Sequence, residues 1–344
     1  MSAVIGWDIG GAHVKAARSE RGEIVGVAQI ACDSHLGMAR IEQAIRAARD
    51  QLGPAAHHCV TMTAELSDVF ENRARGVVLL AAIAAHEIGA GDIVFYAGAH
   101  GLVARDAVAA HADAIASANW RVSAELVAHR VENALFVDLG STTCDLVPIN
   151  DHRVAALGES DASRLQNGEL VYAGFSRGAP QAYARYAPVG GRWTPLVNET
   201  FATMADIRRV LGDLSEGETD ADLAPTADGR PKTIAASRAR LARLAGCDGC
   251  DWNEEQALAF ADCLARAQWR LVEDAIALLA SRSPVVRDAP IVGAGVGRAL
   301  VKRRALAQGR AYADIMDYLP ARENLASRAA DCAPAAALAL MPEN

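Results

Sequence analysis

Two stretches of the chain place an acidic residue and a glycine where an apolar run ends. VIGWDIGGAHVKAA, residues 4–17, predicts a buried strand, a turn at Asp8-Ile9-Gly10-Gly11 and a second strand. ALFVDLGSTTCDLVPI, residues 134–149, repeats the arrangement with Asp138 and Gly140. Glycine in such a turn lets backbone N–H groups approach an anion closely. The repeat favours two phosphate-binding hairpins over two turns that need glycine only for their shape.

Each of the two stretches also has a charged residue at the same distance after its aspartate. Lys15 follows Asp8 by seven residues, and Asp145 follows Asp138 by the same interval, which turn chemistry alone does not require. Two facing hairpins would hold a polyphosphate between two domains, with the carboxylates of Asp8 and Asp138 placed for a divalent cation such as Mg²⁺. The candidate phosphate-binding residues of the two turns are Gly10, Gly11, His13, Gly140, Ser141, Thr142 and Thr143.

A third glycine-rich segment lies late in the chain. APIVGAGVGRALV, residues 289–301, predicts a strand, a turn with Gly293, Gly295 and Gly297, and the start of a helix. The segment lacks the final spacing of a dinucleotide-binding fingerprint, and no strand ending in an acid follows at the expected distance. We therefore assign its glycines to phosphate binding and not to a Rossmann fold.

Three polar clusters outside the hairpins offer further candidates. Thr63, Glu65 and Asp68 follow a predicted strand, where α/β folds expose functional groups, although a capped helix start would also use such residues. The capping explanation applies equally to the segment NETFATMADIRR, residues 198–209. Arg177, in the segment FSRGAP, has two equally good explanations. It would bind an acidic group of the substrate, or it is simply the exposed arginine of a turn. The substrate-binding candidates are Thr63, Arg177, Glu199 and Asp206.

Hydrophobic periodicity indicates a chain of alternating strands and helices around buried sheets. The length of 344 residues suits two domains, which we place at 1–130 and 131–344, with an inserted region at about 153–255. The expected helices are 36–52, 74–89, 112–129 and 253–280, the expected strands between them are 57–63 and 92–97, and 212–232 is an expected loop.

Composition limits the classes of partner. A formal net charge of −8 and a pI of about 5.6 argue against nucleic acid and anionic membranes as partners. The longest apolar stretch, Val77 to Ala85, is nine residues and too short to cross a bilayer, and no signal peptide is visible. Seven scattered cysteines suit a reducing cytoplasm, and Cys247 and Cys250 form a lone CxxC better explained as a loop than as a zinc site. We expect a cytoplasmic protein with small-molecule substrates that is able to form a homo-oligomer.

The order of the three glycine-rich motifs resembles that of the actin, sugar-kinase and acetate-kinase superfamily. The resemblance extends from Met1 to about Lys302, and its specificity lies in all three motifs occurring together. It implies an α/β protein in which two ribonuclease-H-like domains face a central cleft and close on a nucleotide or a phosphorylated ligand.

Further motifs are similar to those of the hydantoinase/oxoprolinase-like proteins linked to tetrahydromethanopterin-dependent one-carbon metabolism. They are WDIGGAxxK from Trp7, TAELSD from Thr63, GELVY from Gly168 and ETFATMAD from Glu199. The turn after Tyr172 departs from the family's Arg-Thr-Pro and reads Arg177-Gly178-Ala179-Pro180. The resemblance implies a synthase of methanofuran or methylofuran biosynthesis, which joins an aminomethyl-furanmethyl diphosphate to the phenol of γ-glutamyltyramine and releases diphosphate.

That chemistry gives the candidate residues roles. The furan oxygen delocalises the cation left when diphosphate departs, so the enzyme needs no covalent nucleophile. Asp8 and Asp138 would hold Mg²⁺, Lys15 would offset leaving-group charge, and Glu65 or Asp68 would accept the phenol proton. Two alternatives stay open: an ATP-dependent kinase or amidohydrolase on the same fold, and a non-catalytic nucleotide switch or assembly protein.

Overall fold

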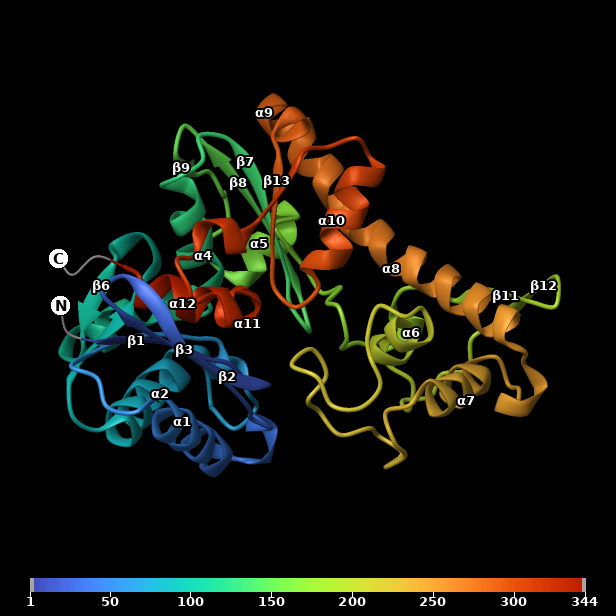
Figure 1. Ribbon diagram of the computed structural model, residues 1–344, viewed down its shortest axis with the longest axis horizontal. Helices are drawn as coiled ribbons and strands as arrows, with labels where there is room; N and C mark the ends of the chain where they lie inside the picture. Colours follow the sequence, from blue (N-terminus) through green and yellow to red (C-terminus); the bar gives the residue numbers. More distant parts are fainter. Residues whose placement is uncertain (1–2, 342–344) are drawn as a thin grey trace.

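The computed structural model describes residues 3–341 and contains two larger β-sheets (Figure 1). The first sheet has the strand order β3-β2-β1-β4-β5-β6. Its first three strands are antiparallel neighbours, and β4 and β5 then continue parallel to β1. The strands are β1 Val4–Ile9, β2 His13–Glu20, β3 Glu23–Ala31, β4 His57–Met62, β5 Asp92–Tyr96 and β6 Leu102–Ala104.

The second sheet repeats this topology in the order β10-β8-β7-β13-β14, with β9 paired to β8. Antiparallel neighbours again lie on one side of the first strand, and parallel strands lie on the other. The predicted pair of ribonuclease-H-like domains is confirmed. The strands are β7 Ala134–Leu139, β8 Cys144–Asn150, β9 Arg153–Val154, β10 Leu170–Val171, β13 Ile291–Ala294 and β14 Tyr312–Asp314.

Helices cover the first sheet much as its sequence predicts. The helix α1, Met38–Leu52, buries Ile41, Ile45 and Leu52 at helical spacing. The helix α2 spans Arg73–Ile88, close to the expected 74–89. The expected helix 112–129 is two helices, α3 Ala112–Ile115 and α4 Asn119–Ala128, because Ser117 between them has a φ of +52°.

The two sheets share one hydrophobic core. Residues of both sheets pack there against α4 and the C-terminal helix α12, Ala333–Ala339. Figure 1 shows α12 beside β1, at the other end of the sequence. The second half also contains α5 Asp161–Asn167, α8 Glu254–Arg282, α9 Pro284–Asp288, α10 Arg298–Ala307 and α11 Ala326–Asp331.

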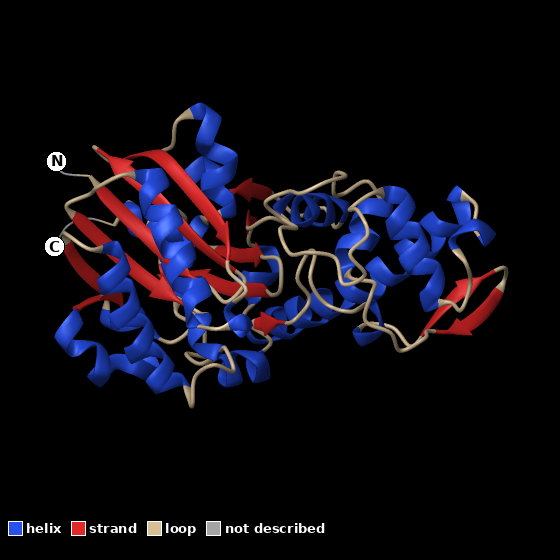
Figure 2. Ribbon diagram, turned by 90° about the horizontal axis from the view of Figure 1, so that it is seen from below, coloured by secondary structure: helices blue, strands red, loops and turns tan. Residues whose placement is uncertain are grey.

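A separate hydrophobic core belongs to the inserted region. It joins α6 Met204–Val210, α7 Ile234–Leu244 and the first half of α8 through residues such as Ile207, Leu241 and Phe260. The two-stranded sheet of β11 Tyr186–Val189 and β12 Arg192–Pro195 lies at the far end of the molecule (Figure 2). Within residues 3–341 the structure has no helix that is both long and apolar enough to cross a membrane.

Substitution of Gly6 tests the packing of α12 on β1. A Cβ at Gly6 would lie 2.0 Å from the carbonyl oxygen of Ala335, so we expect Gly6→Ala to lower the free energy of unfolding by about 3 kcal/mol or more. Gly26→Ala is the matched control on the same sheet, because its Cβ would meet only the end of the Leu52 side chain at 3.0 Å. Urea denaturation measures both variants, and equal stability of the two would contradict this packing.

Candidate functional site

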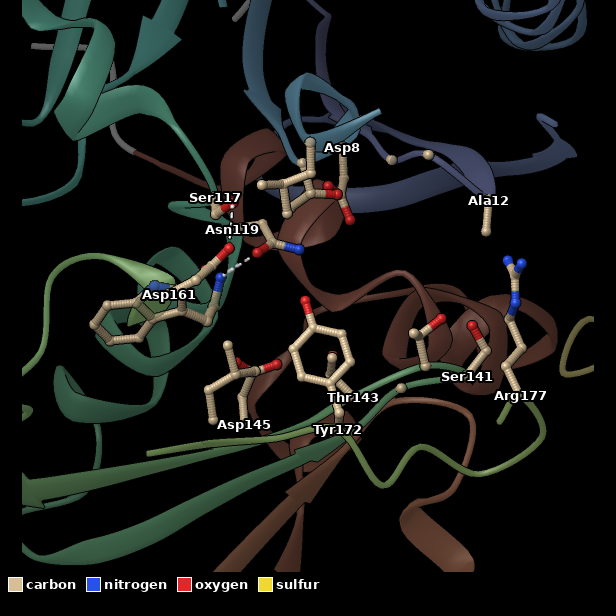
Figure 3. Close-up of a pocket in the computed structure, with 18 of the residues that line it drawn as sticks. Asp8, Ala12, Ser117, Asn119, Ser141, Thr143, Asp145, Asp161, Tyr172 and Arg177 are labelled. Atoms are coloured by element: carbon tan, nitrogen blue, oxygen red, sulfur yellow. Dashed lines mark hydrogen bonds between the residues drawn. The ribbon is translucent and has the colours of Figure 1, made fainter. Parts of the chain in front are cut away.

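The two glycine-rich hairpins line one cavity of about 460 Å³. Residues 10–13 of the first hairpin and 140–143 of the second both contribute to its walls. Figure 3 shows Asp8 and Ala12 on one side and Ser141, Thr143 and Asp145 on the other. The sequence repeat therefore corresponds to two walls that face each other across the cleft.

Both hairpins close in the same way. The N–H of Gly10 donates to the carbonyl of His13 at 2.9 Å, and the N–H of Gly140 donates to the carbonyl of Thr143 at 2.9 Å. In the strand register Asp8 pairs with Lys15 and Asp138 pairs with Asp145. The seven-residue spacing thus places each second charge directly across the ladder from its leading acid.

The turn residues leave backbone donors at the cavity. The N–H groups of Gly11, Ala12, Ser141 and Thr142 donate to no other group in the part of the chain that the structure describes. The first turn is held in place through its carbonyl groups. The carbonyl of Gly11 accepts a hydrogen bond from the N–H of Ser34 at 3.1 Å, and the carbonyl of Ala12 accepts one from the N–H of Cys32 at 2.8 Å. Unpaired amides from two turns form the kind of concavity that binds phosphate oxygens.

A group of carboxylates lies beside these turns. Asp8 is 6% exposed, and its Oδ1 is buried without a hydrogen-bond partner within residues 3–341. Burial raises the pKa of Asp8 to about 6, with a contribution from Asp145 and against the opposing effects of Lys15 and Asn119. Burial, Asp145 and Asp8 together raise the pKa of Asp138 to about 7. These shifts identify a site with too few positive charges for its acids.

Lys15 is the cation placed among these acids. Its Nζ donates to the carbonyl of Asp331, at the end of α11, at 2.7 Å. Burial by itself lowers the pKa of Lys15, but Cys332 and the carboxylates of Asp8 and Asp138 raise it above the ordinary value. Lys15 is therefore charged, and it lines the cavity.

Two further groups lie at the end of the cavity that the two turns form. Burial lowers the pKa of His13 to about 3, aided by Lys15 and Arg177, so its imidazole is neutral and can donate one N–H. Arg177 extends toward Ala12 of the opposite hairpin in Figure 3. Its backbone N–H donates to the carbonyl of Ser141 at 2.8 Å, which ties the Arg177 loop to the second turn.

The other end of the cavity combines polar groups with apolar surface. Ser117 and Asp161 lie there, and their side chains are 3.3 Å apart (Figure 3). Asp145 accepts a hydrogen bond from Arg164 at 2.7 Å, and the Arg164 guanidinium covers the Trp120 ring at 3.9 Å. The apolar surface comes from Leu66, Trp120, Leu170 and Tyr172.

Some residues selected from the sequence lie elsewhere. Glu65 is buried behind Ser117, and Asp68 is exposed outside the cavity lining. Glu199 caps its own turn through the N–H of Ala202 at 3.2 Å. Asp206 completes the capping box of α6 and accepts from Arg240 at 2.9 Å. Capping and ion pairing account for Glu199 and Asp206, so we leave both out of the proposed site.

The late glycines also have a packing explanation. A Cβ on Gly297 would lie 2.4 Å from the Leu139 side chain, and one on Gly293 would lie 2.5 Å from the Tyr312 hydroxyl. Gly295 has a φ of +77°, and its Cβ would lie 2.3 Å from Asp138 Oδ1. None of the three is among the cavity-lining residues. Their predicted phosphate contacts are therefore replaced by close packing of the β13–α10 turn on β7.

Sequence reasoning missed several residues that line the cavity, namely Ser117, Asn119, Trp120, Asp161 and Arg164. Asp145 could have been selected from the sequence repeat, since its position in the second hairpin corresponds to that of Lys15 in the first. The helix break at Ser117-Ala118-Asn119 could not be predicted, because the alanine-rich sequence around it favours an unbroken helix. Asp161 and Arg164 belong to the short helix α5, which hydrophobic periodicity did not predict.

Comparison with known proteins places the chain in a family. It is 29% identical over 293 residues to (4-{4-[2-(γ-L-glutamylamino)ethyl]phenoxymethyl}furan-2-yl)methanamine synthase of Methanocaldococcus jannaschii, covering 85% of this chain and 86% of that protein. It is 34% identical over 122 residues to the protein of the same name from Methanococcus vannielii, covering 35% of this chain and 53% of that protein. Component A of (R)-2-hydroxyglutaryl-CoA dehydratase from Acidaminococcus fermentans has a TM-score of 0.47 and 12% identity, with 98% of this chain and 96% of that chain covered. Residues 57–303 match the hydantoinase/oxoprolinase family, and the chain belongs to that family.

Proposed function

We propose that the protein is a transferase that joins a furanmethyl diphosphate to the phenol of a γ-glutamyltyramine-type acceptor, in methanofuran or methylofuran biosynthesis. The observation that carries this proposal is the similarity to the Methanocaldococcus jannaschii synthase over 85% of the chain. The name of that relative describes a phenoxymethylfuran, which is the ether such a transfer would form. The cavity suits the two substrates because one end offers phosphate donors and the other offers apolar surface.

The phosphate end would stabilise the departing diphosphate. Breaking the bond between the furanmethyl carbon and oxygen leaves a cation that the furan ring delocalises, and the negative charge collects on the leaving group. The unpaired amides of Gly11, Ala12, Ser141 and Thr142 and the ammonium of Lys15 line the cavity and would receive that charge. Donors fixed before the reaction stabilise such charge more effectively than mobile water does.

The acid cluster fits a divalent cation. Asp8 Oδ1 is buried without a partner, and burial and neighbouring acids disfavour the ionised form of Asp138, so a bound cation would stabilise both carboxylates in their ionised form. No group of three or more His, Cys, Asp or Glu side chains within residues 3–341 is arranged to hold a metal by itself. This agrees with Mg²⁺, which commonly takes one or two protein carboxylates together with substrate phosphates. Asp8 lines the cavity, whereas Asp138 does not and lies across the strand ladder from the cavity-lining Asp145. Held by Asp8 and Asp138, the ion would neutralise charge on the leaving diphosphate.

The other end of the cavity would orient the acceptor. Trp120, Leu170 and Tyr172 offer surfaces against which a phenol ring would pack. Glu65 is retained as the proton acceptor instead of Asp68, because it contacts the cavity-lining Ser117 whereas Asp68 faces solvent. The phenol oxygen then attacks the furanmethyl carbon as the carbon–oxygen bond to diphosphate breaks.

The reaction itself provides the first test. Incubated with an aminomethyl-furanmethyl diphosphate, γ-glutamyltyramine and Mg²⁺, the protein should form the aryl ether and release one diphosphate per ether without ATP. Mass spectrometry of the ether and an enzymatic diphosphate assay measure the two products. ADP formation that depends on a small-molecule acceptor, or absence of ether with both substrates present, would contradict the proposal and favour the kinase or amidohydrolase alternative.

Removal of the charged groups tests the phosphate end. We expect Asp8→Asn, Asp138→Asn and Lys15→Ala each to lower kcat/KM by roughly a hundredfold or more, the scale of preorganised electrostatic contacts. Calorimetry should show Mg²⁺-dependent diphosphate binding that both aspartate variants weaken. Asp288→Asn, at the exposed last residue of α9, is the matched control and should leave both measurements unchanged. Unchanged binding in both Asp8→Asn and Asp138→Asn would exclude these acids from the metal site.

A further inference from the structure

Ser117 has a backbone conformation that needs an explanation. It is 5% exposed, its φ is +52°, and it separates α3 from α4 at the wall of the cavity. A serine with positive φ costs free energy, and surrounding contacts must maintain it. Such conformations occur more often where a side chain has to be held in one direction.

The contacts of the Ser117 hydroxyl define its role. It donates to Glu65 Oε1 at 2.7 Å and accepts from Arg73 Nη2 at 2.9 Å. A hydroxyl oxygen has two lone pairs and one proton, so one lone pair remains after these two bonds. Because Ser117 lines the cavity, this lone pair is available to a donor bound there.

Glu65 is the buried end of this chain of contacts. It is 1% exposed, and its Oε2 has no partner within residues 3–341. The helix α2 closes over it, since a Cβ at Gly76 would lie 3.0 Å from Glu65 Cβ. Burial raises the pKa of Glu65 to about 7, against the Ser117 hydrogen bond and Arg73, and Asp161 raises it further. Glu65 can therefore take or release a proton near neutral pH.

We propose that Ser117 is a catalytic residue that relays the acceptor's phenol proton to Glu65. This inference rests on the proposed function. The phenol O–H gives its proton to Ser117 Oγ, and Ser117 gives its own proton to Glu65 Oε1. The phenol oxygen uses the freed electron pair to bond to the furanmethyl carbon, and diphosphate departs with the pair of the broken bond. After product leaves, the proton returns through Ser117 to water in the cavity.

Asp161 is the competing acceptor, because its Oδ2 lies 3.3 Å from Ser117 Oγ. That contact is longer than the 2.7 Å contact to Glu65, and Arg73 also donates to Asp161 at 3.3 Å. Asp161 shares the Arg73 guanidinium, whereas Glu65 is 1% exposed and has an unpartnered Oε2. Glu65 is therefore the better acceptor.

Ser117→Gly and Glu65→Gln test the relay with phenols of different acidity. Glycine tolerates the φ of +52°, so Ser117→Gly removes the hydroxyl without adding strain. With the natural phenol we expect kcat to fall about tenfold to a hundredfold in each variant, and the double variant to be no slower than Glu65→Gln. With ring-fluorinated acceptors, or at higher pH, the loss should shrink, because a more acidic phenol needs less help to lose its proton.

Other outcomes would overturn the relay. If kcat of Ser117→Gly and of Glu65→Gln falls by the same factor for all phenols and at every pH, the two residues only maintain the shape of the cavity. A loss of kcat that shrinks with more acidic phenols in Asp161→Asn but not in Glu65→Gln would transfer the role to Asp161. If the unmodified protein forms no ether with any acceptor, the proposed function itself fails, so the two failures are distinguishable. Glu71→Gln, an exposed neighbour, is the matched control and should behave as the unmodified protein.

Stability against pH gives a readout that does not depend on turnover. Between about pH 4.5, the ordinary pKa of glutamate, and about pH 7, an unfolded Glu65 is ionised while the folded one keeps its proton. The unfolding constant of the unmodified protein, relative to that of Glu65→Gln, should therefore rise with pH in this window by up to about tenfold per pH unit. Urea denaturation measures this ratio, and a ratio that does not change with pH would show that Glu65 is not the proton-holding group.

Discussion

Burial of several like charges around a single lysine is the constraint on which this structure depends. Asp8, Asp138 and Asp145 lie on paired strands of two hairpins, and Lys15 is the ammonium placed among them. Removing carboxylates from water costs free energy, and here it is offset only in part, as the raised pKa values of Asp8 and Asp138 indicate. A site of this kind is more favourable with a cation and an anionic ligand bound than without them.

The duplicated topology explains how two distant stretches of chain form one cavity. Each ribonuclease-H-like sheet presents its first hairpin toward the other, and α4 and α12 pack in a core that both sheets share. Because α12 closes on β1 through the backbone at Gly6, the end of the chain helps to hold the first hairpin in place. The geometry of the cavity between the hairpins therefore depends on contacts between residues more than 300 positions apart, such as Lys15 with Asp331.

The buried acids of this chain differ in how completely their charge is paired, and this decides whether they can exchange a proton. Asp206 lies in a network with Arg209, Ser237 and Arg240 that pairs its charge inside the inserted region. Glu65 has a serine and a distant arginine as partners, with Arg73 at 3.7 Å and one oxygen unpaired. Pairing keeps Asp206 structural, whereas incomplete pairing leaves Glu65 able to exchange a proton.

The sequence by itself determined the two hairpins, the order of the motifs and the longer helices such as α1, α2 and α8, because these depend on local periodicity and on glycine at turns. It also contained the equal seven-residue intervals from Asp8 to Lys15 and from Asp138 to Asp145, and the strand register of the structure turns these intervals into pairs across the ladder. Only the tertiary structure separated Glu65 from Asp68, because burial depends on how α2 packs. It also assigned Asp206 to capping and ion pairing and the late glycines to packing, and it introduced Ser117 by breaking a helix that local propensity favours. Those outcomes depend on contacts between segments distant in the chain, which residue type and spacing do not encode.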